Sequence, residues 1–229
     1  MKGLENPSIA IVDVDCGIPL GDIQEIAAAL QRQVREDFAP WWGAGELAVV
    51  HGVTISVAGE WRLELRKVPT IEGALGYHDE TEDGCPILYV FPELCLEDGS
   101  EWSSCASHEI LEALADPYLR RLVQLDDGRI AALEACDQVE ADTYKIDGVT
   151  VSNFNLPTNF EPPKDLEGVT FDYLGLQTKP FEVRPGGYAQ VYDAIKGWTQ
   201  LGEQRSYRRR VAELGLSRGV RRSSPAIAS

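Results

Sequence analysis

The sequence predicts an α+β fold, in which a mixed β-sheet and a few helices are followed by a β-rich extension. Short apolar runs of strand length alternate with stretches of helical periodicity through residues 1–143. Beyond them the chain turns rich in glycine, proline and asparagine and holds only short strand-like runs. We therefore expect a first domain over residues 1–143, a β-rich extension over residues 144–202 packed on it, and a basic tail over residues 203–229.

The first elements are a buried strand and an amphipathic helix. Residues 9–14 form an apolar run interrupted only by Asp13, which indicates a buried strand. Asp22 is a candidate N-cap, and apolar residues recur at helical spacing through residues 23–38. We expect this helix to end before Pro40, because a proline disfavours the helical conformation of the residue in front of it.

Four further runs predict strands. Residues 46–50 and 53–57 are strand-like, and His51 between them is assigned to a turn. Residues 61–68 alternate apolar and polar side chains, which is typical of a half-buried strand. Residues 87–91 form a short apolar strand between two prolines.

Two helices are expected next, on either side of a turn. The first has Ser103 or Ser104 as its N-cap and runs to about Asp116, where Pro117 ends it. The second, shorter helix covers residues 129–139. In the extension, three short runs predict strands: residues 149–151, 171–174 and 188–192.

The first of these two helices carries a polar stripe. At about 100° per residue, one side of the helix collects His108, Glu109, Glu112 and Asp116. The spacing of His108 and Glu112 puts an imidazole and a carboxylate within reach of one cation. Glu109, beside them, sits where a general base could take a proton from metal-bound water. The alternative is an acidic face in contact with solvent and an incidental histidine.

The second helix adds two carboxylates. Glu134 follows Glu112 at a distance that allows a turn and a return helix to place a third ligand opposite the first two. Asp137, one turn further on, could accept a hydrogen bond from the other ring nitrogen of His108 and so orient the imidazole. The alternative for this pair is an ordinary polar helix face.

These motifs resemble those of an uncharacterised bacterial and phage family of predicted zincin-like metallopeptidases. The resemblance lies in Ser-His-Glu-x-x-Glu-x-x-x-Asp-Pro at residues 107–117 and in Glu-x-x-Asp at residues 134–137. It continues in residues 28–43, in Leu-Gly-Tyr-His-Asp at residues 75–79 and in Pro-Gly-Gly-Tyr at residues 185–188. Most of residues 9–202 is covered, but the arginine-rich tail is not.

The resemblance implies a zincin-like mixed sheet with an active-site helix and a metal-dependent hydrolase, most simply a peptidase acting on peptides or proteins. His108, Glu112 and Glu134 would be the metal ligands, Glu109 the base, and Asp137 and Asp116 supporting residues. Asp116 remains open between two roles, a ligand in place of Glu134 or a cap for the turn that follows.

The order of elements is also similar to that of the gluzincins, to which thermolysin belongs. Gluzincins have a histidine where this chain has Glu112. A ligand set of one histidine and two carboxylates is harder and more anionic, so it would tolerate manganese or calcium as well as zinc.

The same resemblance gives roles to the residues before the strand at 87–91. In zincins this neighbourhood faces the cleft, so His78 or Tyr77 could steady a substrate oxyanion, with Tyr144 and Tyr188 as weaker candidates. The alternative for His78 and Tyr77 is a polar loop. The strand at 87–91 itself would be a free edge that offers backbone groups to an extended peptide.

The net charge of −16 is unevenly distributed. Residues 203–229 hold seven arginines and two glutamates, a charge of +5, which leaves −21 on residues 1–202. Nucleic acid is therefore an improbable partner for the body of the protein, because its phosphates would be repelled. The tail could contact an assembly partner or form a solvated, flexible end.

Three further features of the sequence bear on the cellular compartment of the protein. No apolar run is long enough for a membrane span, and the N-terminus lacks the apolar core of a signal peptide. Five cysteines without a C-x-x-C pair fit a reduced protein, either cytoplasmic or inside a phage particle. The acidic body and basic tail also allow a second function, a phage-particle or scaffold protein that keeps a degenerate zincin fold.

Overall fold

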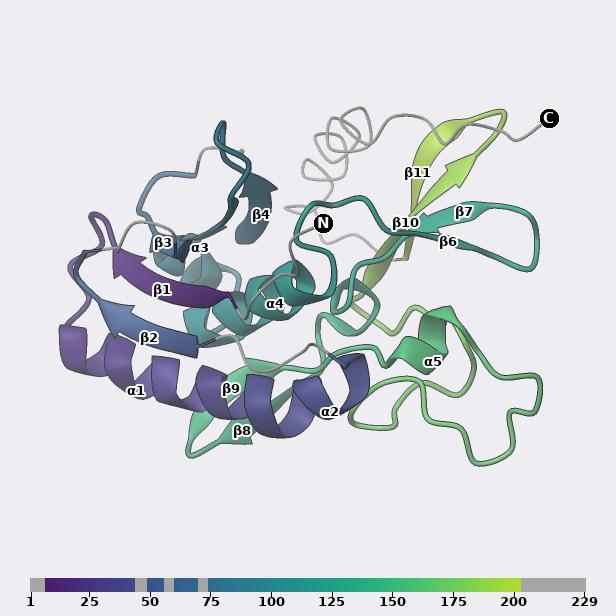
Figure 1. Cartoon of the computed structure of the whole chain (residues 1–229), viewed down its shortest axis with the longest axis horizontal. Coiled ribbons are helices and arrows are strands. Elements are labelled where there is room, and N and C mark those ends of the chain that lie inside the picture. Colours follow the sequence, from purple (N-terminus) through teal and green to yellow (C-terminus); the bar gives the residue numbers. More distant parts are fainter. Residues whose placement is uncertain (1–6, 44–48, 56–59, 70–73, 203–229) are drawn as a thin grey trace.

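The computed structural model describes residues 7–43, 49–55, 60–69 and 74–202, and a five-stranded mixed sheet lies in its N-terminal half (Figure 1). The strand order is β2-β1-β3-β5-β4. Four of these strands are parallel: β2 (Val49–Val53), β1 (Ser8–Asp13), β3 (Trp61–Leu65) and β5 (Pro86–Val90). The fifth, β4 (Gly76–Glu80), is an edge strand antiparallel to β5. The predicted combination of helices with a mixed sheet is confirmed.

Two predictions for this sheet are wrong. The strand expected to be a free edge is β5, which pairs with β3 on one side and β4 on the other. Its apolar sequence suits that central position, and the more polar β4 takes the edge. His51 does not lie in a turn, because it is inside β2 and pairs with Ala10. Residues 46–48 and 56–57 of the predicted neighbouring strands lie outside the described residues.

A long helical run packs against the β2 side of the sheet (Figure 1). It consists of α1 (Leu20–Arg32), a π-helical turn η1 (Gln33–Phe38) and α2 (Ala39–Trp42). Asp22 lies in the first turn and caps nothing with its side chain, because the helix begins earlier, after Pro19. Pro40 does not end the run either. It falls in the first turn of α2, where the missing N–H of proline is tolerated.

The second helical segment packs against the β4 and β5 part of the same sheet. After α3 (Pro92–Glu97), helix α4 (Trp102–Ala115) packs against β4, β5 and the hairpin of β8 (Thr143–Ile146) and β9 (Val149–Ser152). The prediction of Ser103 or Ser104 as the N-cap of this helix is wrong. Glu101 is the N-cap residue, and its side chain makes no capping hydrogen bond. The Ser103 hydroxyl donates instead to the Thr150 carbonyl at 2.8 Å, and that of Ser104 to the Glu101 carbonyl at 2.7 Å.

The predicted helix over residues 129–139 does not form. A hairpin of β6 (Leu122–Gln124) and β7 (Ile130–Ala132) takes its place, followed by a loop and a single 3-10 turn, η2 (Asp137–Val139). The reason is long-range pairing. β7 joins β10 (Tyr188–Asp193), which pairs with β11 (Gly197–Gly202), in a second sheet of order β11-β10-β7-β6.

The rest of the extension contains little regular structure. A short helix α5 (Pro157–Phe160) precedes a long loop, and the strand predicted at residues 171–174 is reduced to one bridge between Asn155 and Asp172. A single hydrophobic cluster joins the first sheet, both long helices and the β8–β9 hairpin, for example through Ile11, Leu30, Ile110 and Val151. No helix among the described residues is long and apolar enough to cross a membrane.

The contact between α1 and β2 depends on Gly52. A Cβ atom there would lie 2.7 Å from Ile23 Cγ2 and 2.9 Å from the Ile23 carbonyl carbon. We expect Gly52→Ala to lower the free energy of unfolding by about 1–3 kcal/mol, because α1 must move away from the sheet. Gly21→Ala is the matched control, since Gly21 has open space around it. Urea denaturation of both variants measures the effect, and equal stabilities would contradict the close contact.

Candidate metal centre

The polar stripe of α4 is buried. His108, Glu109 and Glu112 are 8%, 6% and 4% exposed, because β4, β5 and β9 all pack against this helix. Charged side chains are rarely buried to this extent unless they are paired or bind a metal. A solvated acidic face is therefore excluded for these three residues.

A hydrogen-bonded network fixes α4 at the residue before His108. The Ser107 hydroxyl donates to Gln33 Oε1 at 2.6 Å and accepts from the backbone N–H of Ser152 at 3.0 Å. The Gln33 side chain closes the ring by donating to the Ser152 carbonyl at 2.8 Å. Three elements, η1, α4 and β9, are thereby tied together. The sequence analysis gave no role to Gln33, although it lies in the stretch of residues 28–43 that shares in the family resemblance.

The first group of candidate ligands surrounds one nitrogen of His108. His108 Nε2 lies 3.3 Å from Glu112 Oε1 and 3.3 Å from Asp137 Oδ1. Glu112 comes from the next turn of α4, and Asp137 from η2. Asp137 was expected at the other ring nitrogen, but it shares Nε2 with Glu112. These three side chains thus offer donor atoms that lie within 4.8 Å of one another.

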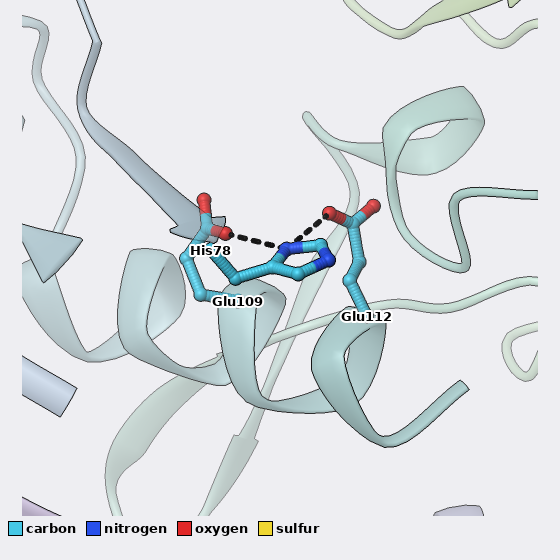
Figure 2. Close-up of side chains that lie close together, drawn as sticks. All are labelled: His78, Glu109 and Glu112. Carbon is cyan, nitrogen blue, oxygen red and sulfur yellow. Dashed lines mark hydrogen bonds and ion pairs between the residues drawn. The ribbon is translucent and has the colours of Figure 1, made fainter. Parts of the chain in front are cut away.

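A second group surrounds His78, which β4 directs toward α4 (Figure 2). This fully buried imidazole has its Nδ1 3.3 Å from Glu109 Oε2 and 3.9 Å from Glu112 Oε2. Its Nε2 is buried and has no hydrogen-bond partner among the described residues. His78 therefore lies in a strand among carboxylates and not in a polar loop.

Two other predicted residues lie away from this centre. Side chains alternate along a strand, so Tyr77 points opposite to His78, and its ring packs 4.8 Å from that of Tyr89. Asp116 follows the last residue of α4, where its Oδ2 accepts the backbone N–H of Arg121 at 2.7 Å. Of its two predicted roles, Asp116 has the contacts of a cap for the turn.

Glu134 lies close to the centre but belongs to neither group of ligands among the described residues. It is buried in the loop between β7 and η2, not on a helix. Its negative charge contributes to the raised pKa of both His78 and Glu112, which places it near both side chains.

The electrostatics of the metal-free centre favour bound protons. Burial, reinforced by the charges of Asp137 and Glu134, raises the pKa of Glu112 to about 8. Burial opposes protonation of His108, but the charges of Glu112 and Asp137 outweigh it and hold the His108 pKa well above its usual value. The pKa of His78 is also raised, because its hydrogen bond to Glu109 and the nearby carboxylates outweigh burial. Protons therefore neutralise charge that a cation could neutralise instead.

An open cleft of about 750 Å³, counting the space at its mouth, leads to these residues. Its walls include Gly76 of β4, His108 and Glu109 of α4, and Tyr188 of β10. Burial raises the Tyr188 pKa well above its usual value, and the nearby carboxylate of Asp137 reinforces the shift. Tyr144, the other tyrosine considered, instead donates its hydroxyl to Asp37 at 2.7 Å.

Gly187 allows the start of β10 to approach the backbone of η2. A Cβ atom at Gly187 would overlap the carbonyl group of Gln138 and lie 2.9 Å from the carbonyl oxygen of Asp137. The Pro-Gly-Gly-Tyr motif thus brings β10 directly against η2, so Tyr188 forms part of the cleft wall next to the centre.

No protein-family model, curated protein or solved structure matches this chain. The chemistry of the centre follows from its donors, which are imidazole nitrogens and carboxylate oxygens. Such a set suits zinc, and its carboxylate content also suits manganese.

The raised pKa values predict how pH affects the stability of the metal-free protein. Glu112 ionises at about pH 8 when folded but near its ordinary value of 4.5 when unfolded, and His78 and His108 also hold their protons more tightly when folded. The folded chain therefore binds more protons above pH 4.5, so stability falls as pH rises, by at most about 1.4 kcal/mol per pH unit for each retained proton.

The measurement is the melting temperature in chelator at a series of pH values between about 5.5 and 8.5. Glu112→Gln cannot ionise and should flatten the dependence. A metal-free protein that grows more stable toward alkaline pH would contradict this account of the centre.

Proposed function

We propose that the protein is a metal-dependent hydrolase, with a divalent ion held by His108, Glu112 and Asp137. The observation that carries the proposal is the meeting of two carboxylates at one buried imidazole nitrogen, each 3.3 Å away. Two ligands ~2.1 Å from a tetrahedral ion lie about 3.4 Å apart, so this spacing suits zinc without rearrangement. Asp137 thus replaces Glu134 in the proposed ligand set. Glu134 would instead add a negative charge close to the ion.

The remaining residues of the cleft supply the groups that hydrolysis needs. A divalent ion, when bound, polarises a carbonyl group and lowers the pKa of water. Glu109 precedes the ligand Glu112 by one helical turn and lines the cleft, so it can accept a proton and return it to the leaving group. His78 holds the Glu109 carboxylate in place through the contact at 3.3 Å. Tyr188, which comes from β10, also lines the cleft and can donate a hydrogen bond to a developing oxyanion.

Peptides are the substrate class that the edge of the sheet favours. Among the described residues β4 pairs with β5 alone, and Gly76 at its start lines the cleft. The other side of β4 is therefore suited to an extended peptide, which would add a strand and pass the metal ligands. This assignment transfers the substrate site from β5, which is central, to β4.

Metal titration tests the ligand set. We expect His108→Ala and Asp137→Ala to abolish tight zinc binding, because each removes a donor from one shared site. Glu134→Ala should weaken binding by less than either, and Asp116→Ala should leave affinity unchanged while lowering stability. His51→Ala is the matched control, because this histidine lies in β2 and pairs with Glu60.

Isothermal titration calorimetry at one pH, on chelator-stripped protein, gives the affinities. Wild-type protein that binds neither zinc nor manganese would contradict the proposal. A scaffold or interaction protein with a degenerate centre would then be the better description.

Hydrolysis provides a separate test. Glu109→Gln keeps the shape of the side chain but cannot accept a proton, so we expect kcat to fall by about 10²–10⁴ while an ion stays at His108. Cleavage of an unstructured protein such as casein, with zinc or manganese supplied, is the assay. A Glu109→Gln variant as active as the wild type would exclude Glu109 as the base.

A further inference from the structure

The centre contains more donors than one ion uses. His78, Glu109 and Glu112 form a second group whose donor atoms also lie within 4.8 Å of one another. All three side chains are buried, and they come from two elements, β4 and α4 (Figure 2). The proposed hydrolase site uses only Glu112 of this group as a ligand.

Glu112 belongs to both groups through different oxygens. Its Oε1 faces His108 at 3.3 Å, whereas its Oε2 faces His78 at 3.9 Å. A carboxylate that presents one oxygen to each of two imidazoles has the arrangement of a bridging ligand between two metal ions. In two-metal hydrolytic sites such ions lie ~3.5–4 Å apart.

His78 points independently to a ligand. The side chain is fully buried, and its Nε2 has no hydrogen-bond partner among the described residues. A buried polar atom without a partner typically costs about 1–3 kcal/mol, and an ion at Nδ1, which faces Glu109 and Glu112, would fix the ring with its proton on Nε2, ready for a carboxylate acceptor. A metal-bound imidazole commonly uses its second nitrogen to contact a carboxylate, and Glu134 is close enough for its charge to raise the His78 pKa.

The charges support two ions over one. Four buried carboxylates converge here, those of Glu109, Glu112, Glu134 and Asp137. The ion pairs of Glu109, Glu112 and Asp137 in the described part of the chain are with histidines, not with lysine or arginine. With neutral imidazoles, one divalent ion would still leave the carboxylates of Glu109, Glu112 and Asp137 with a buried net charge of −1, which a second ion would compensate.

We propose that the centre binds two divalent ions, the second held by His78, Glu109 and Glu112, with Glu112 bridging the pair. This inference rests on the proposed function and adds a second ion to it. Glu109 would bind through Oε2, which faces His78. Its Oε1 lies on the side of Gly76, a residue that lines the cleft, and stays available to accept a proton.

Manganese provides a test that does not depend on activity. Chelator-stripped protein is loaded with Mn²⁺, separated from free metal by gel filtration, and analysed for metal content and by electron paramagnetic resonance. We expect two ions per chain and the spectrum of an exchange-coupled pair. His78→Gln should hold one ion with an uncoupled spectrum, and the control His51→Gln should hold two.

The outcomes separate the two proposals. Wild-type protein with one uncoupled ion would overturn the second site and leave the hydrolase proposal standing. Two ions that persist in folded His78→Gln would also overturn it, because His78 would then hold neither. Wild-type protein with no ion would remove both proposals. The wild-type stoichiometry and spectrum decide the question even if the His78 variant does not fold.

Discussion

Desolvation of the polar stripe on α4 is the constraint on which the rest of this structure depends. An imidazole and two carboxylates on one helix are nearly closed off from water, although charged groups lose several kcal/mol each when water is removed. The packing of β4, β5 and β9 around α4 imposes that cost, and the groups must neutralise one another or bind cations. Without a metal, the raised pKa values of Glu112, His78 and His108 mean that these groups hold protons, and those protons neutralise part of the negative charge.

Much of the surrounding architecture serves to place donors against this helix. The network of Gln33, Ser107 and Ser152 fixes the rotation of α4, so its stripe faces the cleft and not the core. On the other side, Gly76 leaves room for Glu109, since a Cβ atom there would lie 3.0 Å from the Glu109 side chain. Gly187 likewise leaves room for η2, because the absence of a side chain allows β10 to approach the η2 backbone. Glycines thus occur where the backbone passes close to the candidate ligands.

The sequence predicted the helix of the site better than its other parts. Helical periodicity and spacing were enough to join His108 and Glu112, because both belong to one regular element. His78 could not be found in this way. Its strand is polar and short, and only pairing with β5 makes it a strand. The prediction of a helix over residues 129–139 was wrong for a related reason. Their alanine-rich pattern suits a helix, whereas the strand β10 that pairs with β7 lies far along the chain.

The loop that carries Asp137 also determines when the centre can be completed during synthesis. Several backbone hydrogen bonds that hold this loop come from later residues: Asn155 donates to the Ala135 carbonyl at 2.6 Å, and Arg184 donates to the Gln138 carbonyl at 2.8 Å. A nascent chain that has been made only as far as η2 therefore possesses His78, His108, Glu112 and Asp137, but it lacks the later residues whose hydrogen bonds hold this loop in place. Assembly of the candidate ligands therefore becomes one of the last steps of biogenesis, and unfinished chains lack the complete group.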